Sequence, residues 1–195
     1  YLQGVPVNPN DYRQGWNDVD LRYTLEVYDV ADNYADAVPV KDRQVIIVDE
    51  YQPVVFDLRL VPNRDYHFVV FADFVEDGKH AEKVNPAIDA QAELGLHHSI
   101  GENLGQISIK DDAINDESTD AYFATKDITI VNSASQDIVL QRPYGKIRVI
   151  ATDLAELNLN VDPAKVVVTY DAHHPVAFNA VTGKIDTEVK AEALT

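Results

Sequence analysis

Apolar and polar side chains alternate along the segment from Leu21 to Tyr28. The apolar residues stand at positions 21, 23, 25 and 27, and the polar residues Arg22, Thr24 and Glu26 lie between them. Successive side chains of a β-strand point to opposite faces, so this period of two predicts a strand with one buried and one exposed face. A chain built from such segments folds into antiparallel sheets that each turn one face to a core.

Further strands are predicted in both halves of the chain. Residues 66–74 are apolar at nearly every position, which is typical of a central strand buried on both faces. Turn residues at 61–65 separate it from the alternating segment Val54–Leu60, which predicts a hairpin. The other predicted strands are Gln44–Val48, Asp127–Val131, Asp137–Gln141, Lys146–Ala151 and Lys165–Tyr170.

Many short strands with turns between them favour an all-β fold, a two-sheet β-sandwich, over a sheet of β-α-β units. The core is expected to hold the inward side chains of the alternating strands. These residues are Leu21, Leu25, Phe56, Leu58, Phe68, Val70, Ile147 and Val149.

The domain organisation follows from composition. Residues 1–18 are expected to form an N-terminal leader or edge segment, and residues 19–195 one β-sandwich domain. Within it, residues 77–120 form an acidic insertion. Asn85, Pro86 and Gly95 there carry the cap, first-turn and termination signals of one short helix.

The chain is strongly acidic. It has 33 Asp and Glu residues against 16 Lys and Arg, a formal net charge of −17. Such a field repels nucleic acid phosphates and anionic lipid headgroups, so no nucleic acid partner and no peripheral membrane binding are expected. Solubility is the ordinary reason for this charge, and binding of cations or basic partners is the alternative.

Cysteine and methionine are both absent. Disulfides, thiol catalysis and cysteine-based zinc sites are therefore excluded for this sequence. A start at Tyr1 instead of methionine is typical of a mature or trimmed chain, so any signal peptide or lipid-bearing cysteine would lie upstream.

Histidines and an acidic run are the candidates for metal binding. Neighbours in a strand face opposite sides, so neither His97–His98 nor His173–His174 is expected to chelate one ion, and both pairs are predicted on surface loops. His67 is predicted to be a hydrogen-bonded structural residue. The run Asp111–Asp120 lacks the alternating ligands and turn glycine of an EF-hand. The sequence predicts no metal and no cofactor.

No motif for a serine nucleophile, a phosphate-binding loop, a dinucleotide or a zinc protease occurs. Paired carboxylates for glycoside hydrolysis stay open, because sequence does not reveal their separation. No catalytic residue is predicted, and the chain is expected not to be an enzyme. Tyr1, Tyr12 and Trp16 are the aromatic residues best placed for contact with a partner.

Five segments, taken in order, resemble the fimbrillin-like surface lipoproteins of Bacteroidales. They are Leu21–Asp29, Phe71–Val75, Asp120–Phe123, Arg142–Val149 and Phe178–Gly183. One departure is mild, since Phe71 and Phe74 stand where relatives often carry Trp and Tyr. The resemblance implies a transthyretin-like sandwich with Greek-key connections. It also implies export as a lipoprotein, display at the outer membrane of the cell surface, and a second β-domain after this one.

The resemblance further implies a structural or accessory subunit of a fimbrium, or pilus, that takes part in cell adhesion. Its partners would be other fimbrial subunits, joined by strand donation. In fimbrillins that polymerise, a trypsin-like protease cuts after an arginine shortly before the first strand, and Arg13 stands in that place. A monomeric surface lipoprotein that binds glycans or host proteins is the alternative, with residues 1–13 as a plain leader.

Overall fold

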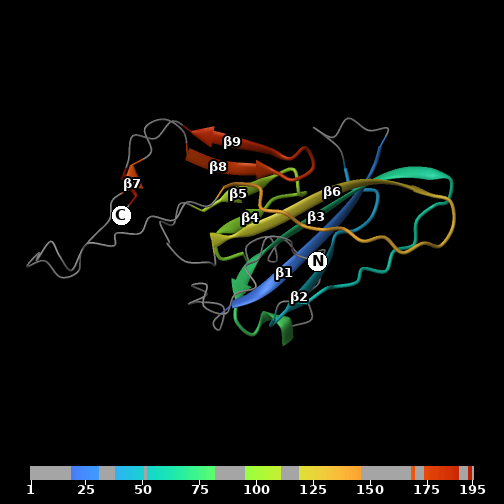
Figure 1. Cartoon of the computed structure of the whole chain (residues 1–195), viewed down its shortest axis with the longest axis horizontal. Helices are drawn as coiled ribbons and strands as arrows, with labels where there is room; N and C mark the ends of the chain where they lie inside the picture. Colours follow the sequence, from blue (N-terminus) through green and yellow to red (C-terminus); the bar gives the residue numbers. More distant parts are fainter. Residues whose placement is uncertain are drawn as a thin grey trace, which may run out of the picture.

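The structure is a computed structural model in which the described part of the chain is all-β. Two four-stranded antiparallel sheets form a sandwich, as the sequence predicts (Figure 1). No helix among these residues is long and apolar enough to cross a membrane. The described residues are 19–30, 38–50, 52–81, 95–110, 119–145, 168–169, 174–188 and 193–194.

The larger sheet has the strand order β2-β1-β3-β6. Its strands are β1 (Val19–Asp29), β2 (Gln44–Val48), β3 (Arg64–Glu76) and β6 (Ala121–Ile130). β3 pairs with β1 along one side and with β6 along the other, and Tyr66 to Val75 are all buried. The central strand predicted from the apolar run at 66–74 is therefore confirmed.

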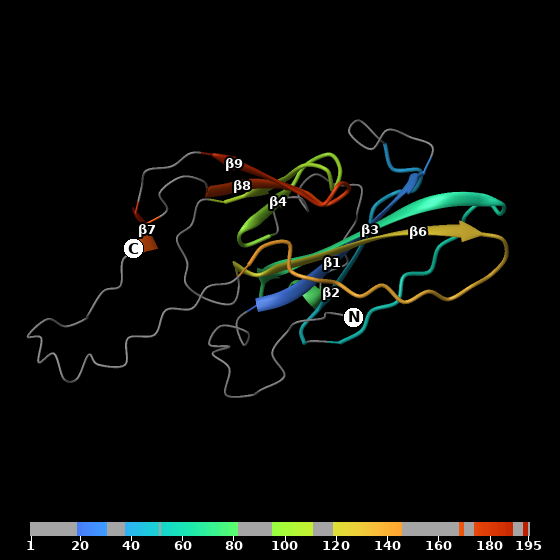
Figure 2. The same ribbon diagram turned by 45° about the horizontal axis from the view of Figure 1, so that its top comes forward.

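The smaller sheet has the order β4-β5-β8-β9 and lies over the larger one in Figure 2. Its strands are β4 (His98–Ile100), β5 (Ile107–Ile109), β8 (His174–Asn179) and β9 (Lys184–Glu188). A short separate pair consists of β7 (Val168–Thr169) and β10 (Ala193–Leu194). Gly183 turns the chain between β8 and β9 at a φ of 67°, a left-handed conformation that glycine adopts without steric cost.

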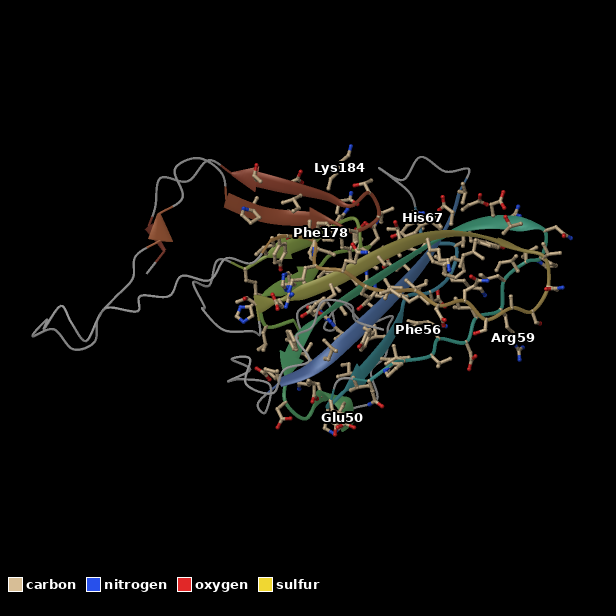
Figure 3. All side chains as sticks on the ribbon, viewed as in Figure 1. Glu50, Phe56, Arg59, His67, Phe178 and Lys184 are labelled. Carbon is tan, nitrogen blue, oxygen red and sulfur yellow. The ribbon has the colours of Figure 1, made fainter. Side chains whose placement is uncertain are left out.

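One core fills the space between the two sheets. Val69 and Phe71 of β3 pack there with Ile107 and Phe178 of the smaller sheet, and all four are almost completely buried. The ring of Phe178, labelled in Figure 3, meets Phe123 edge-on at 4.7 Å between centroids. Edge-on packing of aromatic rings adds to the free energy of burial, so this cluster joins the sheets.

A second core lies on the other face of the larger sheet. Leu21, Leu25, Phe68 and Val70 are buried in it, as predicted. The segment Val54–Leu60 packs against it with side chains that alternate between half-buried and exposed. The predicted core residues Phe56 and Leu58 belong to this segment and are half-buried, and Ile147 and Val149 lie outside the described residues.

The prediction of a strand at Val54–Leu60, and of a hairpin joining it to β3, is wrong. The backbone is extended, but within the described residues no backbone hydrogen bond pairs it with another segment. Both edges of β3 are occupied by β1 and β6, so the preceding segment cannot form a hairpin with β3 and packs against the apolar core instead. The turn itself is confirmed, since Asn63 has a φ of 60°.

The remaining strand predictions have mixed outcomes. Gln44–Val48 is confirmed as β2, and Asp127–Val131 falls mainly within the longer β6. Asp137–Gln141 is not a strand. Among the described residues a bridge between Phe123 and Gln141 joins it to β6, and Ile138 packs on the core. Of Lys165–Tyr170, the structure describes β7 alone. The strand Lys146–Ala151 lies outside the described residues, and so does the helix expected at 85–95 except for Gly95, which forms a bridge with Val75.

Candidate functional site

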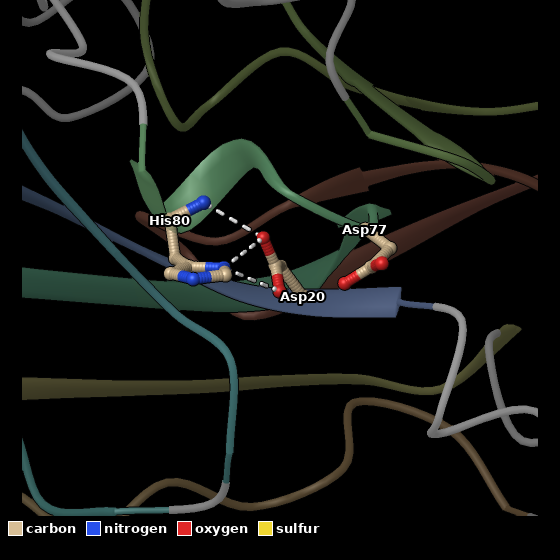
Figure 4. Close-up of side chains that lie close together, drawn as sticks. All are labelled: Asp20, Asp77 and His80. Atoms are coloured by element: carbon tan, nitrogen blue, oxygen red, sulfur yellow. Dashed lines mark hydrogen bonds and ion pairs between the residues drawn. The ribbon is translucent and has the colours of Figure 1, made fainter.

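Three side chains with metal-binding donor atoms meet at one end of the larger sheet (Figure 4). Asp20 is near the start of β1, Asp77 follows the end of β3, and His80 lies in the 3-10 turn η2 (Lys79–Ala81). The antiparallel pairing of Val19 with Glu76 brings the start of β1 to the end of β3. The sheet therefore positions the two aspartates, and η2 places the histidine over them.

His80 and Asp20 are joined twice. The backbone N–H of His80 donates to Oδ2 of Asp20 at 2.7 Å, and ring Nδ1 lies 2.9 Å from Oδ2 and 3.1 Å from Oδ1. Nε2 on the opposite side of the ring lies 3.9 Å from Oδ2 of Asp49. A carboxylate oxygen of each of Asp20 and Asp77 and a ring nitrogen of His80 lie within 4.8 Å of one another.

The electrostatics of the site are set by its carboxylates. The side chain of Asp20 has no exposed surface, whereas His80 is about one-third exposed, at 37%. The hydrogen bond to Asp20 raises the pKa of His80 above its usual value, and the charges of Asp20, Asp49 and Asp77 act in the same direction, against desolvation. The site can therefore hold a positive charge, either on a protonated imidazole or on a bound cation.

A buried ion pair stands beside this site, between the sheets. Arg22 of β1 donates two hydrogen bonds to Asp73 of β3, from Nε at 2.8 Å and from NH2 at 2.6 Å, and both side chains are about 99–100% buried. Gly95 passes so close that a β-carbon there would lie 2.6 Å from Oδ2 of Asp73 and 2.0 Å from the backbone oxygen of His98. The pair therefore requires glycine at position 95.

A second buried charge, Glu26, lies further along β1. Its carboxylate accepts hydrogen bonds from the Tyr28 hydroxyl, from the Leu104 backbone N–H at 2.7 Å and from Arg43 Nε at 2.8 Å. Arg43 also donates to the backbone oxygens of Gly101 and Glu102. This network ties β1 to the connection between β4 and β5, which is a structural role.

These charges correct the interpretation of β1. The sequence predicts that Arg22, Thr24 and Glu26 face solvent, but they are 1%, 0% and 1% exposed. The reason is that the smaller sheet covers the face that carries them, so β1 is buried on both faces. The alternating pattern predicted the strand correctly, but its prediction that the polar face is exposed to solvent is wrong.

The histidines also depart from the prediction. His97 and His98 are buried, at 5% and 2% exposure, and are not on a surface loop, because β4 pairs with β5 inside the sandwich. Nε2 of His98 lies 2.8 Å from the hydroxyl of Tyr144, which donates to the backbone oxygen of Thr119 at 3.2 Å. Burial lowers the pKa of His98 to about 4. For the second pair the structure describes only the backbone of His174.

His67 is the hydrogen-bonded structural residue that the sequence predicts. Its Nδ1 lies 2.6 Å from Oδ1 of Asp127, and its Nε2 lies 3.1 Å from the backbone oxygen of Val181. It therefore joins β3 to β6 and to the turn after β8.

Most of the other predicted site residues cannot be placed. Arg13, Tyr1, Tyr12 and Trp16 lie outside the described residues. Of the acidic run at 111–120, Thr119 and Asp120 are described. Asp120 accepts hydrogen bonds from Arg142 at 2.7 and 3.1 Å, so the end of the run is tied to the sandwich.

Sequence reasoning missed Asp20, Asp77 and His80 altogether. Asp20 and His80 are 60 positions apart, and no local spacing connects them. For the neighbouring ion pair a signal was present in the sequence. Asp73 interrupts a mostly apolar strand, and a buried aspartate indicates a cationic partner such as Arg22.

Comparison with known proteins gives one match, to a protein family. No curated protein and no solved structure matches the chain. Residues 6–194 match the model described as "Family of unknown function (DUF6562)". That match covers nearly the whole sequence, and the chain belongs to this family.

Proposed function

We propose that this chain is a structural or accessory subunit of a bacterial cell-surface fimbria, with a transthyretin-like, Greek-key sandwich as its assembly unit. In this proposal it is exported as a lipoprotein, displayed at the outer membrane, joined to other subunits by strand addition and active in adhesion instead of catalysis. The resemblance of five ordered segments to fimbrillin-like proteins motivates the proposal, and the two-sheet antiparallel fold is compatible with it.

The extended segment Val54–Leu60 is the observation that supports this function. Its half-buried side chains Val54, Phe56, Leu58 and Leu60 pack against the core on the outer face of the larger sheet. Its backbone forms no ladder within the described residues. An extended segment whose backbone forms no ladder within the described residues, beside an apolar core, offers a position for one more strand.

Strand addition satisfies both features of this segment. An incoming strand forms hydrogen bonds with the free backbone groups, and its alternate side chains add to the apolar core. Cleavage after Arg13 belongs to the proposal as the step that precedes assembly, as it does in the fimbrillins that polymerise.

A proline at position 57 tests this mode of assembly. The N–H of Asp57 has no hydrogen bond within the described residues, and the segment is extended, so proline is compatible with the monomer. Proline removes a donor that an added strand needs. We expect Asp57→Pro to lower the yield of oligomers by about tenfold, and Asp57→Ala, which keeps the N–H, to leave it unchanged.

The measurement is the ladder of oligomers in mild denaturant, and filaments in electron micrographs, before and after limited trypsin treatment that cuts after Arg13. Equal ladders from Asp57→Pro and Asp57→Ala would contradict assembly on this segment. A chain that stays monomeric throughout would favour the monomeric lipoprotein that binds glycans or host proteins.

A further inference from the structure

We propose that Asp20, Asp77 and His80 form a binding site for a divalent transition-metal ion of the zinc type. This proposal replaces the expectation of no metal, which rested on spacing along the sequence. It concerns one end of the larger sheet and does not depend on assembly through Val54–Leu60.

The first support is the distance between donor atoms. Nδ1 of His80 lies 2.9 and 3.1 Å from the two carboxylate oxygens of Asp20. In a tetrahedral zinc site with bonds of about 2.0–2.1 Å, two ligand atoms lie roughly 3.3 Å apart. The pair therefore needs to open by only a few tenths of an ångström to admit the ion.

Asp77 can supply the third ligand to an ion held between Asp20 and His80. A carboxylate oxygen of Asp77 lies within 4.8 Å of the other two donor atoms, and its residue is exposed in the turn after β3. Gly78 follows it with a φ of 85°, so the turn places Asp77 immediately before a glycine-specific bend. Asp20 and His80 are fixed by their hydrogen bonds, and Asp77 is the ligand with freedom to move.

The second, independent support is the carboxylate at the other ring nitrogen. Oδ2 of Asp49 stands 3.9 Å from Nε2 of His80, on the side away from Asp20. A metal-bound histidine usually donates its second ring N–H to a carboxylate, which fixes the ring and strengthens the ligand. Asp49 is placed for that role, and a small shift of its exposed side chain brings it into hydrogen-bond range.

The charge of the site also favours a bound cation. Asp20 and Asp49 lie within ion-pair distance of the ring of His80, and a carboxylate oxygen of Asp77 lies within 4.8 Å of the donor atoms of Asp20 and His80. Asp20 is completely buried, and a buried carboxylate needs a compensating charge. A divalent ion supplies two charges where a protonated imidazole supplies one.

The donor set selects the class of ion. Imidazole nitrogen is a ligand for zinc and its transition-metal neighbours, whereas calcium and magnesium take oxygen ligands. One nitrogen and two carboxylates leave a fourth position toward solvent at the exposed side of His80. Binding displaces the proton that Nδ1 shares with Asp20, so the affinity must fall as the pH is lowered.

Calorimetric titration of the full chain with zinc chloride, after treatment with EDTA, tests the proposal at pH 7.5. We expect one ion per chain, and a loss of affinity of at least about tenfold in Asp77→Asn and in His80→Ala. Asp186→Asn, an exposed aspartate in β9, is the matched control and should bind like the wild type. Cobalt should give the visible absorption of a tetrahedral site in the wild type and in Asp186→Asn only. Calcium should not compete.

Two results would overturn the metal site. One is the absence of zinc binding in a folded wild-type chain. The other is zinc binding that survives unchanged in both Asp77→Asn and His80→Ala, which would assign the ion to other histidines. In either case the cluster is a hydrogen-bonded histidine–aspartate pair without a metal, and the strand-addition test is unaffected.

Discussion

Replacing Asp73 with asparagine should lower the free energy of unfolding by about 3 to 5 kcal/mol. The substitution removes the negative charge that accepts these two hydrogen bonds from the buried guanidinium of Arg22. The loss is large because the charge of Arg22 cannot reach solvent at 1% exposure. Urea denaturation of wild type and variant measures it.

Two controls separate the charge from the shape of the side chain. The double variant Arg22→Met, Asp73→Leu removes both charges and should recover most of the loss, because apolar residues of similar volume often replace a buried ion pair without cost. Arg64→Gln breaks a pair with Asp29 whose arginine is 58% exposed, and should change stability by less than about 0.5 kcal/mol. A loss below about 1 kcal/mol in Asp73→Asn would show that water reaches Arg22.

The second large effect is a loss of stability in mild acid, carried by His98. Tyr144 has one hydroxyl hydrogen and donates it to Thr119, so Nε2 of His98 must be the donor to Tyr144. Nδ1 is then unprotonated, and it is buried without a hydrogen-bond partner. A proton added there would find no acceptor, with the charges of Arg22 and Lys110 nearby.

The direction of the effect follows from the pKa of His98, which burial lowers from 6.5 to about 4, with Asp73 opposing the shift and His97, Arg22 and Lys110 adding to it. As the pH is lowered, the imidazole of His98 takes up a proton at a higher pH in the unfolded chain than in the folded chain. The free energy of unfolding that depends on neutral His98 is therefore fully present above pH 6.5, and it is lost as the pH falls toward 4. A shift of this size corresponds to about 3 kcal/mol.

Denaturation of wild type and His98→Phe between pH 7 and pH 4 measures this contribution. Phenylalanine keeps the ring that packs on Phe71 and removes the titrating nitrogen. The variant should lose about 3 kcal/mol less than the wild type over this range, because carboxylates common to both cancel in the comparison. Equal losses would mean that His98 takes up its proton in the folded state without penalty.

Sequence periodicity predicted the central strand and β1 correctly, but it did not predict which extended segments pair with a neighbour. The run at 66–74 is apolar on both faces, and β3 is indeed central because strands pair on each side of it. Val54–Leu60 has the same kind of pattern as β1, yet only β1 is a strand. Period two reports which face is buried, and it does not report whether a neighbour is available for backbone pairing.

Local sequence patterns could not predict the candidate site of Asp20, Asp77 and His80. Asp20 lies just before the alternating segment, and His80 lies in the acidic insertion 60 positions further along the chain. The register that sets Val19 opposite Glu76 is what brings them together. Register depends on contacts across the whole sheet, so spacing along the chain could not predict it.

Hydrogen–deuterium exchange of the backbone amides at 54–60 tests the proposed function most directly. In the monomer these amides have no backbone partner within the described residues, so they should exchange rapidly, whereas those of β3 should be strongly protected. In the assembled form the account predicts that the amides at 54–60 become protected while those of β3 do not change. Rapid exchange at 54–60 in both forms would contradict assembly by strand addition on this segment.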